Sequence, residues 1–87
     1  TLGRQLVEER LAACVNLLPR MVSIYRWEGR IQSEEEFVLL AKTSRAKADA
    51  LCARVDELHS YDVPCAVVLP IEGGLPGFLG WMAEQTR

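Results

Sequence analysis

The sequence of 87 residues predicts a single α+β domain that is built on an antiparallel sheet. Two observations support this fold class. Residues 23–43 are rich in residue types that favour strands, and one tight turn divides them, which indicates a long β-hairpin. Helical periodicity precedes and follows the hairpin, over residues 2–12 and 45–58. The chain is therefore expected to place helices against a sheet whose main feature is the hairpin.

The first expected helix spans residues 2–12 and carries an apolar stripe made of Leu2, Leu6, Val7 and Leu11. A short apolar strand is expected at residues 14–18, directly before Pro19. Because proline cannot donate a hydrogen bond to a sheet, Pro19 should mark a bend, a bulge or an edge position. The strand is expected to resume at residues 21–27.

The hairpin is expected to turn at Glu28, Gly29 and Arg30, because glycine adopts the positive φ angle that such a turn needs. The polar residues 32–36 are interpreted as its solvated outer part, and a cation site there is the weaker alternative. The second arm is apolar on both faces, with one face made of Phe37, Leu39 and Ala41 and the other of Val38 and Leu40. A strand of this kind must be covered on both faces. The helices of one chain cover one face, so a second copy is expected to cover the other.

The remaining elements follow from capping and breaking residues. Ser44 is a good N-cap for a helix over residues 45–58, whose apolar face is Ala48, Leu51, Cys52, Val55 and Leu58. The continuous apolar run at residues 65–69 is too short for a helix and predicts a buried strand. Pro76 suits the first position of a last helix, with a buried side made of Leu75, Phe78, Leu79 and Met82 and with Trp81 on a flank.

The predicted order is helix, strand, strand, helix, strand, helix. One strand in front would make it the β-α-β-β-α-β pattern of a ferredoxin-like sandwich, with an extra C-terminal helix. In that sheet the first strand lies between the third strand and the last one. We therefore expect the natural chain to begin ahead of Thr1 with such a strand; the alternative is that another segment takes its place in the sheet.

Composition narrows the class of function. The formal net charge is −2 and no basic stripe is present, which argues against nucleic acid as a partner. No apolar run is long enough for a membrane span. The three cysteines are widely spaced and form no Cys-x-x-Cys pair, which is typical of reduced thiols in a cytoplasmic protein.

Several motifs together resemble the CutA family, the divalent-cation tolerance proteins. They are residues 8–16, the Tyr-x-Trp-Glu-Gly turn within residues 23–29, the pair Lys42 and Thr43, the corner at residues 58–64, and residues 69–71. The match covers essentially the whole chain in order. The resemblance implies a ferredoxin-like subunit in a homotrimer, a link to copper and other divalent cations, and a cytoplasmic location.

The resemblance also implies a metal site. The family opens with a strand that ends in a cysteine implicated in copper binding, and neither is present in these 87 residues. Of the family's copper set, only His59 carries over directly. Cys65 is a second candidate ligand, six residues further along. The sequence requires no cofactor, and copper or another divalent cation is the candidate ligand.

Two alternatives to metal binding exist for His59. The first is structural: His59 ends a helix, where a positive charge suits the helix dipole. The second is an enzyme in which Cys65 is a nucleophile and His59 its base. That pair has no evident orienting group and no oxyanion hole, so we expect the protein not to be an enzyme.

A second candidate site is a ligand cleft near a subunit boundary, which would combine aromatic rings, a cation and carboxylates. Its residues are Trp27, Glu28, Lys42, Tyr61 and Asp62. The alternative is that the aromatic residues only pack an interface. The cleft supports a second function hypothesis, a trimeric small-molecule sensor that signals to a protein partner, by analogy of fold with the trimeric nitrogen-regulatory signal proteins.

Overall fold

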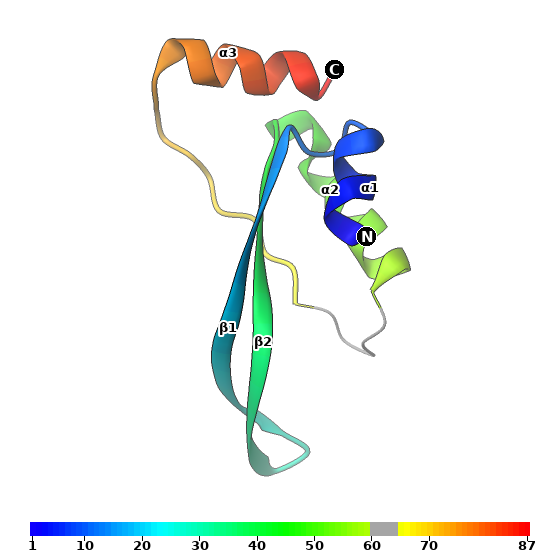
Figure 1. The fold of residues 1–87 in the computed structure, drawn as a ribbon, viewed down its shortest axis with the longest axis vertical. Coiled ribbons are helices and arrows are strands. Elements are labelled where there is room, and N and C mark those ends of the chain that lie inside the picture. Colours follow the sequence, from blue (N-terminus) through cyan, green and yellow to red (C-terminus); the bar gives the residue numbers. More distant parts are fainter. Residues whose placement is uncertain (60–64) are drawn as a thin grey trace.

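A long β-hairpin dominates the structure, a computed structural model that describes residues 1–59 and 65–87. Strand β1 (Cys14–Trp27) pairs antiparallel with strand β2 (Arg30–Lys42), in a register that runs from Cys14 opposite Lys42 to Trp27 opposite Arg30. The helices α1 (Leu2–Glu8), α2 (Arg45–Leu58) and α3 (Pro76–Gln85) complete the α+β fold. Figure 1 shows α1 and α2 beside one half of the hairpin, while the other half extends beyond them.

The hairpin turns at two of the three predicted residues, and the third, Arg30, already belongs to β2. Glu28 and Gly29 form a two-residue turn, and both have positive φ angles, of 50° and 78°. A turn of this kind matches the right-handed twist of the two strands, which is why short hairpins favour it. Gly29 takes its angle without a steric penalty because it has no Cβ.

The expected irregularity at Pro19 is also confirmed. The register of the two strands breaks between Leu18 and Met21, so that Pro19 and Arg20 lie in a bulge. Arg20 has a φ angle of 62°, in the left-handed region. The bulge places Pro19 where its missing N–H costs no ladder hydrogen bond, and bulges also increase the local twist.

Helix α2 has the predicted bounds, and Ser44 is its N-cap residue with an extended backbone, although its side chain makes no capping hydrogen bond. Helix α3 begins at Pro76, as expected. None of the described helices has both the length and the apolar composition that a membrane crossing needs.

Helix α1 ends at Glu8, earlier than the predicted end at residue 12. Arg10 adopts a φ angle of 60°, which no helical residue has. The backbone N–H groups of Leu11 and Ala12 then donate to the carbonyl oxygen of Leu6, at 3.0 and 3.1 Å. Residues 11 and 12 therefore fold back over the last turn of α1. Leu11 still packs against the same core as Leu6, although the helix has already ended.

The hydrophobic core is small and lies between the helices and one face of the hairpin. Its buried residues are Leu6, Ala12, Leu51 and Val55. Leu39 and Ala41 of β2 pack against this cluster. Leu40 points to the other face and remains 47% exposed. The helices of one chain therefore cover Leu39 and Ala41, whereas Phe37, which was predicted on the same face, is 73% exposed.

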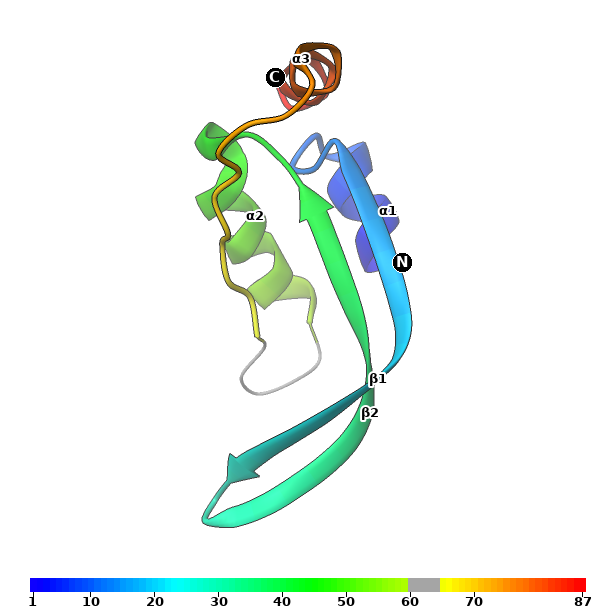
Figure 2. The same cartoon turned by 90° about the vertical axis from the view of Figure 1, so that its left-hand side faces the viewer.

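The expected strand at residues 65–69 does not form. Residues 65–70 have no regular secondary structure, and the side chains of Val67 and Leu69 are 76% and 78% exposed. Figure 2 shows residues 65–75 as an extended connection that leads up to α3. A strand exists through ladder hydrogen bonds to a neighbour, and the described part of β2 pairs only with β1. An apolar run alone was not sufficient to predict pairing.

The predicted buried side of α3 is only partly correct. Met82 is buried and Leu79 is half-buried, but Leu75 is 79% exposed and Phe78 is 42% exposed. The Thr86 hydroxyl, also buried, donates to the carbonyl oxygen of Met82 at 2.9 Å. Helix α3 therefore contacts the rest of the chain mainly through its C-terminal half.

One charged group joins the loop after α1 to helix α2. The Arg54 guanidinium donates two hydrogen bonds of 2.9 Å to the carboxylate of Glu9 and one of 2.9 Å to Glu57. The hydrogen bond from Arg54 holds the pKa of the Glu9 carboxyl below its ordinary value, and the same bond raises the pKa of Arg54. This planar, two-bond geometry makes the pair specific in orientation.

The substitution Leu6→Ala should destabilise the protein by about 2–5 kcal/mol, because it leaves a cavity at the only large side chain that is completely buried among the described residues. Val7→Ala is the matched control, since Val7 is the next residue and is 41% exposed. Its loss should be about 1 kcal/mol or less. Urea denaturation of the three proteins measures both values, and equal losses would contradict the assignment of the core.

The Glu9–Arg54 pair should make stability depend on pH. The pKa of Glu9 is lower in the folded than in the unfolded chain, so the contribution of the pair is complete above the unfolded pKa. It is lost as pH falls through the folded pKa. When the pH is lowered from about 7 to about 3, wild type should lose more stability than Glu9→Gln or Arg54→Gln does, because only wild type has the pair to lose. Denaturation midpoints at both pH values test this, and an unchanged acid dependence in both variants would refute it.

Candidate functional site

His59 lies at the C-terminal end of α2. It is the C-cap residue, with an extended backbone at φ −80° and ψ 142°, and its N–H donates to the carbonyl oxygen of Val55 at 2.8 Å. Its side chain is half-buried. The position at a helix C-terminus agrees with the structural interpretation of His59.

Cys65 is exposed and, like Cys14 and Cys52, forms no disulfide. It opens the extended segment that leads to α3. Tyr61 and Asp62, which were also predicted to line a site, lie outside the described residues. Within residues 1–59 and 65–87, no three His, Cys, Asp or Glu side chains gather closely enough to hold a metal ion.

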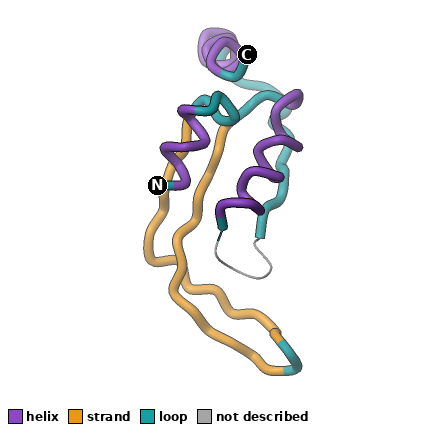
Figure 3. The backbone as a smooth tube through the Cα atoms, turned by 90° about the vertical axis from the view of Figure 1, so that its right-hand side faces the viewer, coloured by secondary structure: helices purple, strands orange, loops and turns teal. Residues whose placement is uncertain are grey.

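The other residues of the predicted cleft lie at the two ends of the hairpin. Trp27 and Glu28 are at the tip, whereas Lys42 ends β2 beside the helices. The 13 residues of β2 would span roughly 40 Å if the strand were straight. Figure 3 shows the tip at the opposite end of the molecule from α3. A single chain therefore does not bring Trp27 or Glu28 near Lys42.

Lys42 instead has aromatic neighbours from α3. Its ammonium nitrogen lies 5.6 Å from the centroid of the Phe78 ring, within the range of a cation–π interaction. The Phe78 and Trp81 rings stack with centroids 5.7 Å apart. Nothing in the sequence associates these rings with Lys42. Their spacing of three residues on a predicted helix indicates a shared face, but the element that they meet depends on tertiary structure.

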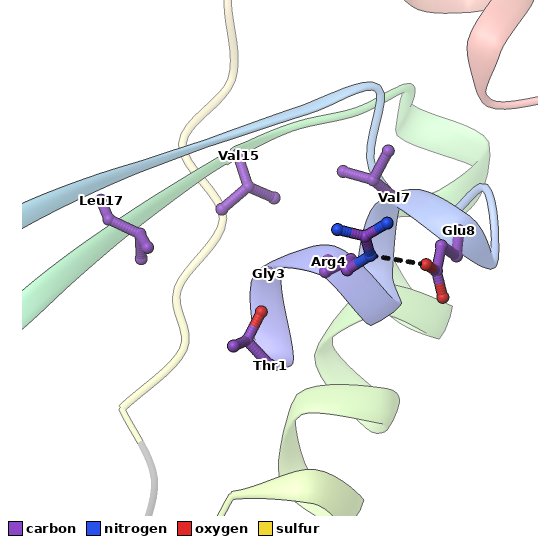
Figure 4. Close-up of a pocket in the computed structure, with 7 residues that line it drawn as sticks. All are labelled: Thr1, Gly3, Arg4, Val7, Glu8, Val15 and Leu17. Carbon is purple, nitrogen blue, oxygen red and sulfur yellow. Dashed lines mark hydrogen bonds and ion pairs between the residues drawn. The ribbon is translucent and has the colours of Figure 1, made fainter.

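A shallow apolar cavity of about 400 Å³ lies between α1 and β1. Figure 4 shows Val7 on the helix facing Val15 on the strand, with the ion pair between Arg4 and Glu8 at the rim. A Cβ added to Gly3 would lie 3.1 Å from Val15, so glycine permits the close approach of α1 to β1. Both residues of the ion pair are strongly exposed, and the cavity has few polar groups with which to orient a ligand.

Comparison with known proteins identifies the family. The family described as "CutA1 divalent ion tolerance protein" matches residues 1–85. The divalent-cation tolerance protein CutA of Thermus thermophilus is 48% identical over 86 residues, which cover 99% of this chain and 84% of that protein. The chloroplastic CutA of Arabidopsis thaliana is 43% identical over 86 residues. The chain spans 47% of the length of that plant relative.

Solved structures show the same fold. The divalent cation tolerance protein of Thermus thermophilus superposes with a TM-score of 0.95 at 46% identity, covering 99% of this chain and 84% of that one. A protein from Nostoc, described as a PII-like CutA in apo form, gives a TM-score of 0.92 at 38% identity, with coverage of 99% and 84%. These likenesses confirm the predicted ferredoxin-like class. The chain belongs to the CutA1 family of divalent ion tolerance proteins.

Proposed function

We propose that this protein assembles as a homotrimer in the cytoplasm and binds copper or another divalent cation as part of cation tolerance. The observation that carries this proposal is the family match over residues 1–85, since relatives are named divalent-cation tolerance proteins. The three cysteines without disulfides support a reducing compartment. In this proposal the protein is not an enzyme and has no nucleic-acid partner.

The outer half of the hairpin supports assembly. Its side chains include several large apolar groups that are more than 60% exposed, namely Val22, Ile24, Ile31 and Phe37. Burying each of them completely would contribute about 1.5–3 kcal/mol. Several large apolar side chains exposed on one hairpin favour an interface between proteins. A second copy of the chain is the proposed cover for this surface. In a closed ring of three copies, the hairpin of each copy would be covered by a neighbouring copy.

In the proposed metal site, the imidazole of His59 is the first ligand and the thiolate of Cys65 is the second. Imidazole and thiolate both suit copper, and thiolate favours the Cu(I) state. Metals of this kind usually take three or four ligands. The remaining ligands therefore come from a neighbouring copy or from solvent, and we expect an affinity that is micromolar or weaker.

A trimeric small-molecule sensor is the second candidate function. The placement of the cleft residues favours it, because Trp27 and Glu28 at a hairpin tip can meet Lys42 only when the tip belongs to another copy. Tyr61 and Asp62 would complete such a cleft between subunits. The solved relative from Nostoc, which is described as PII-like, adds an analogy with signalling proteins.

Assembly through the hairpin predicts a particle with three times the mass of the 9.7-kDa chain. Ile24→Glu should shift it toward monomer, because Ile24 is 72% exposed on the outer half of the hairpin and a buried unpaired charge is costly. Leu75→Glu is the matched control, at a residue that is 79% exposed outside the hairpin. Gel filtration with light scattering measures the masses. A stable wild-type monomer would end the proposal.

Metal binding at His59 predicts that His59→Ala weakens copper(II) binding by at least about tenfold. When copper is supplied as Cu(II) at neutral pH, Cys65→Ser should weaken binding less than His59→Ala does. When copper is supplied as Cu(I), Cys65→Ser should weaken binding more than His59→Ala does. Cys52→Ser is the control for loss of a thiol elsewhere in the chain. Titration calorimetry on one preparation compares the two functions: copper(II) and zinc(II) test metal binding, and nucleotides test the small-molecule sensor. Equal copper affinity in wild type and His59→Ala would remove His59 from the site.

A further inference from the structure

A second cavity, of about 260 Å³, lies where the C-terminal ends of α1 and α3 meet the start of β1. Drug-sized ligands occupy cavities of about 300–1,000 Å³, so this one suits a smaller metabolite. It contains none of the residues predicted from the sequence for a metal site or a cleft. Its lining consists of Val7, Glu8, Arg10, Ala12, Ala13, Trp81 and Gln85.

The cavity carries one charge of each sign, and the two charges do not pair with each other. Glu8 accepts a hydrogen bond from Arg4 at 2.9 Å through one carboxylate oxygen, in an exposed pair. Such surface pairs contribute little, so this contact leaves Glu8 available to a ligand. Arg10 donates one long hydrogen bond, of 3.4 Å, to the carbonyl oxygen of Gln85. Among the ion pairs of the described residues, none joins Glu8 to Arg10.

Arg10 retains most of its capacity to bind an anion. A guanidinium has five N–H donors in a planar fork that matches a carboxylate. The backbone of Arg10 is held at a φ angle of 60°, and its N–H donates to the carbonyl oxygen of Val7 at 3.1 Å. Residues other than glycine rarely adopt a positive φ angle. In Arg10 this backbone conformation directs the side chain from the end of α1 toward the C-terminal end of α3, where it reaches Gln85.

Apart from Gln85, whose carbonyl oxygen accepts the hydrogen bond from Arg10, the rest of the lining is apolar. Trp81 is 44% exposed, and its ring is supported from one side by the stacked ring of Phe78. Ala12 and Ala13 are buried and provide a wall of small side chains. A ligand for this cavity therefore needs an anionic group for Arg10, a cationic group for Glu8 and an apolar body for Trp81.

We propose that this cavity binds a free α-amino acid with an apolar side chain. Its carboxylate would pair with Arg10, its ammonium group with Glu8, and its side chain would lie against Trp81 and the two alanines. A simple anion would be repelled by Glu8 and a simple cation by Arg10, so the pair of charges selects a zwitterion. The lining of this cavity contains none of the residues proposed for copper binding or for the cleft.

Titration with L-leucine, followed by the NMR signals of the two tryptophan indole N–H groups, tests the site. The indole of Trp81 and the amides of Ala12 and Ala13 should shift. 4-Methylpentanoate, which lacks the ammonium group, and L-leucinamide, which lacks the carboxylate, should each bind at least about tenfold more weakly. No shift at Trp81 with L-leucine up to about 10 mM would overturn the proposal.

Substitutions provide an independent measurement. Arg10→Gln and Glu8→Gln should each weaken L-leucine binding by at least about tenfold. Arg20→Gln is the matched control for Arg10, because Arg20 is also exposed with a positive φ angle but lies in the hairpin bulge. It should bind as wild type does. Circular dichroism verifies that each variant is folded. Equal affinity in wild type, Arg10→Gln and Glu8→Gln would overturn the assignment, as would equal binding of L-leucine and 4-methylpentanoate.

Discussion

The ladder of hydrogen bonds between β1 and β2 extends much further than the helices that cover it, and the rest of the structure depends on this mismatch. Near Leu39 and Ala41 the sheet packs against the core of α1 and α2. Beyond the bulge at Pro19 the same ladder continues with apolar side chains such as Ile24 exposed on it. The ladder satisfies the backbone, but it cannot bury the side chains. The hairpin therefore satisfies its own backbone hydrogen bonds but leaves large apolar side chains of its outer half exposed.

The loop between α1 and β1 joins the other elements. Glu9 holds helix α2 through Arg54, and Arg10, the next residue, reaches the C-terminal end of α3. The left-handed backbone of Arg10 sends the two side chains to different helices. This loop forms both a structural contact and one wall of the second cavity, so the position of α3 and the shape of that cavity are coupled through it.

Local signals in the sequence were sufficient for much of the fold. Gly29 indicated the turn, Pro19 the bulge, and Pro76 the start of the last helix, because each of these residues has a restricted or unusual backbone that acts within a few positions. Helix α2 was predicted to its bounds from apolar spacing and Ser44. The strand at residues 65–69 was predicted wrongly, because a strand requires a partner and an apolar run does not specify one.

By itself, the sequence determined where the chain turns, where its helices begin and which residues have the chemistry to bind a ligand. The tertiary structure alone decided which of these residues meet. It separated Trp27 from Lys42 along the hairpin, placed Lys42 against Phe78, and brought Arg10 and Trp81 to one cavity although they are far apart in the chain. Backbone preferences act between neighbours in sequence, whereas a binding site requires contacts between distant segments, and those depend on how the whole chain packs.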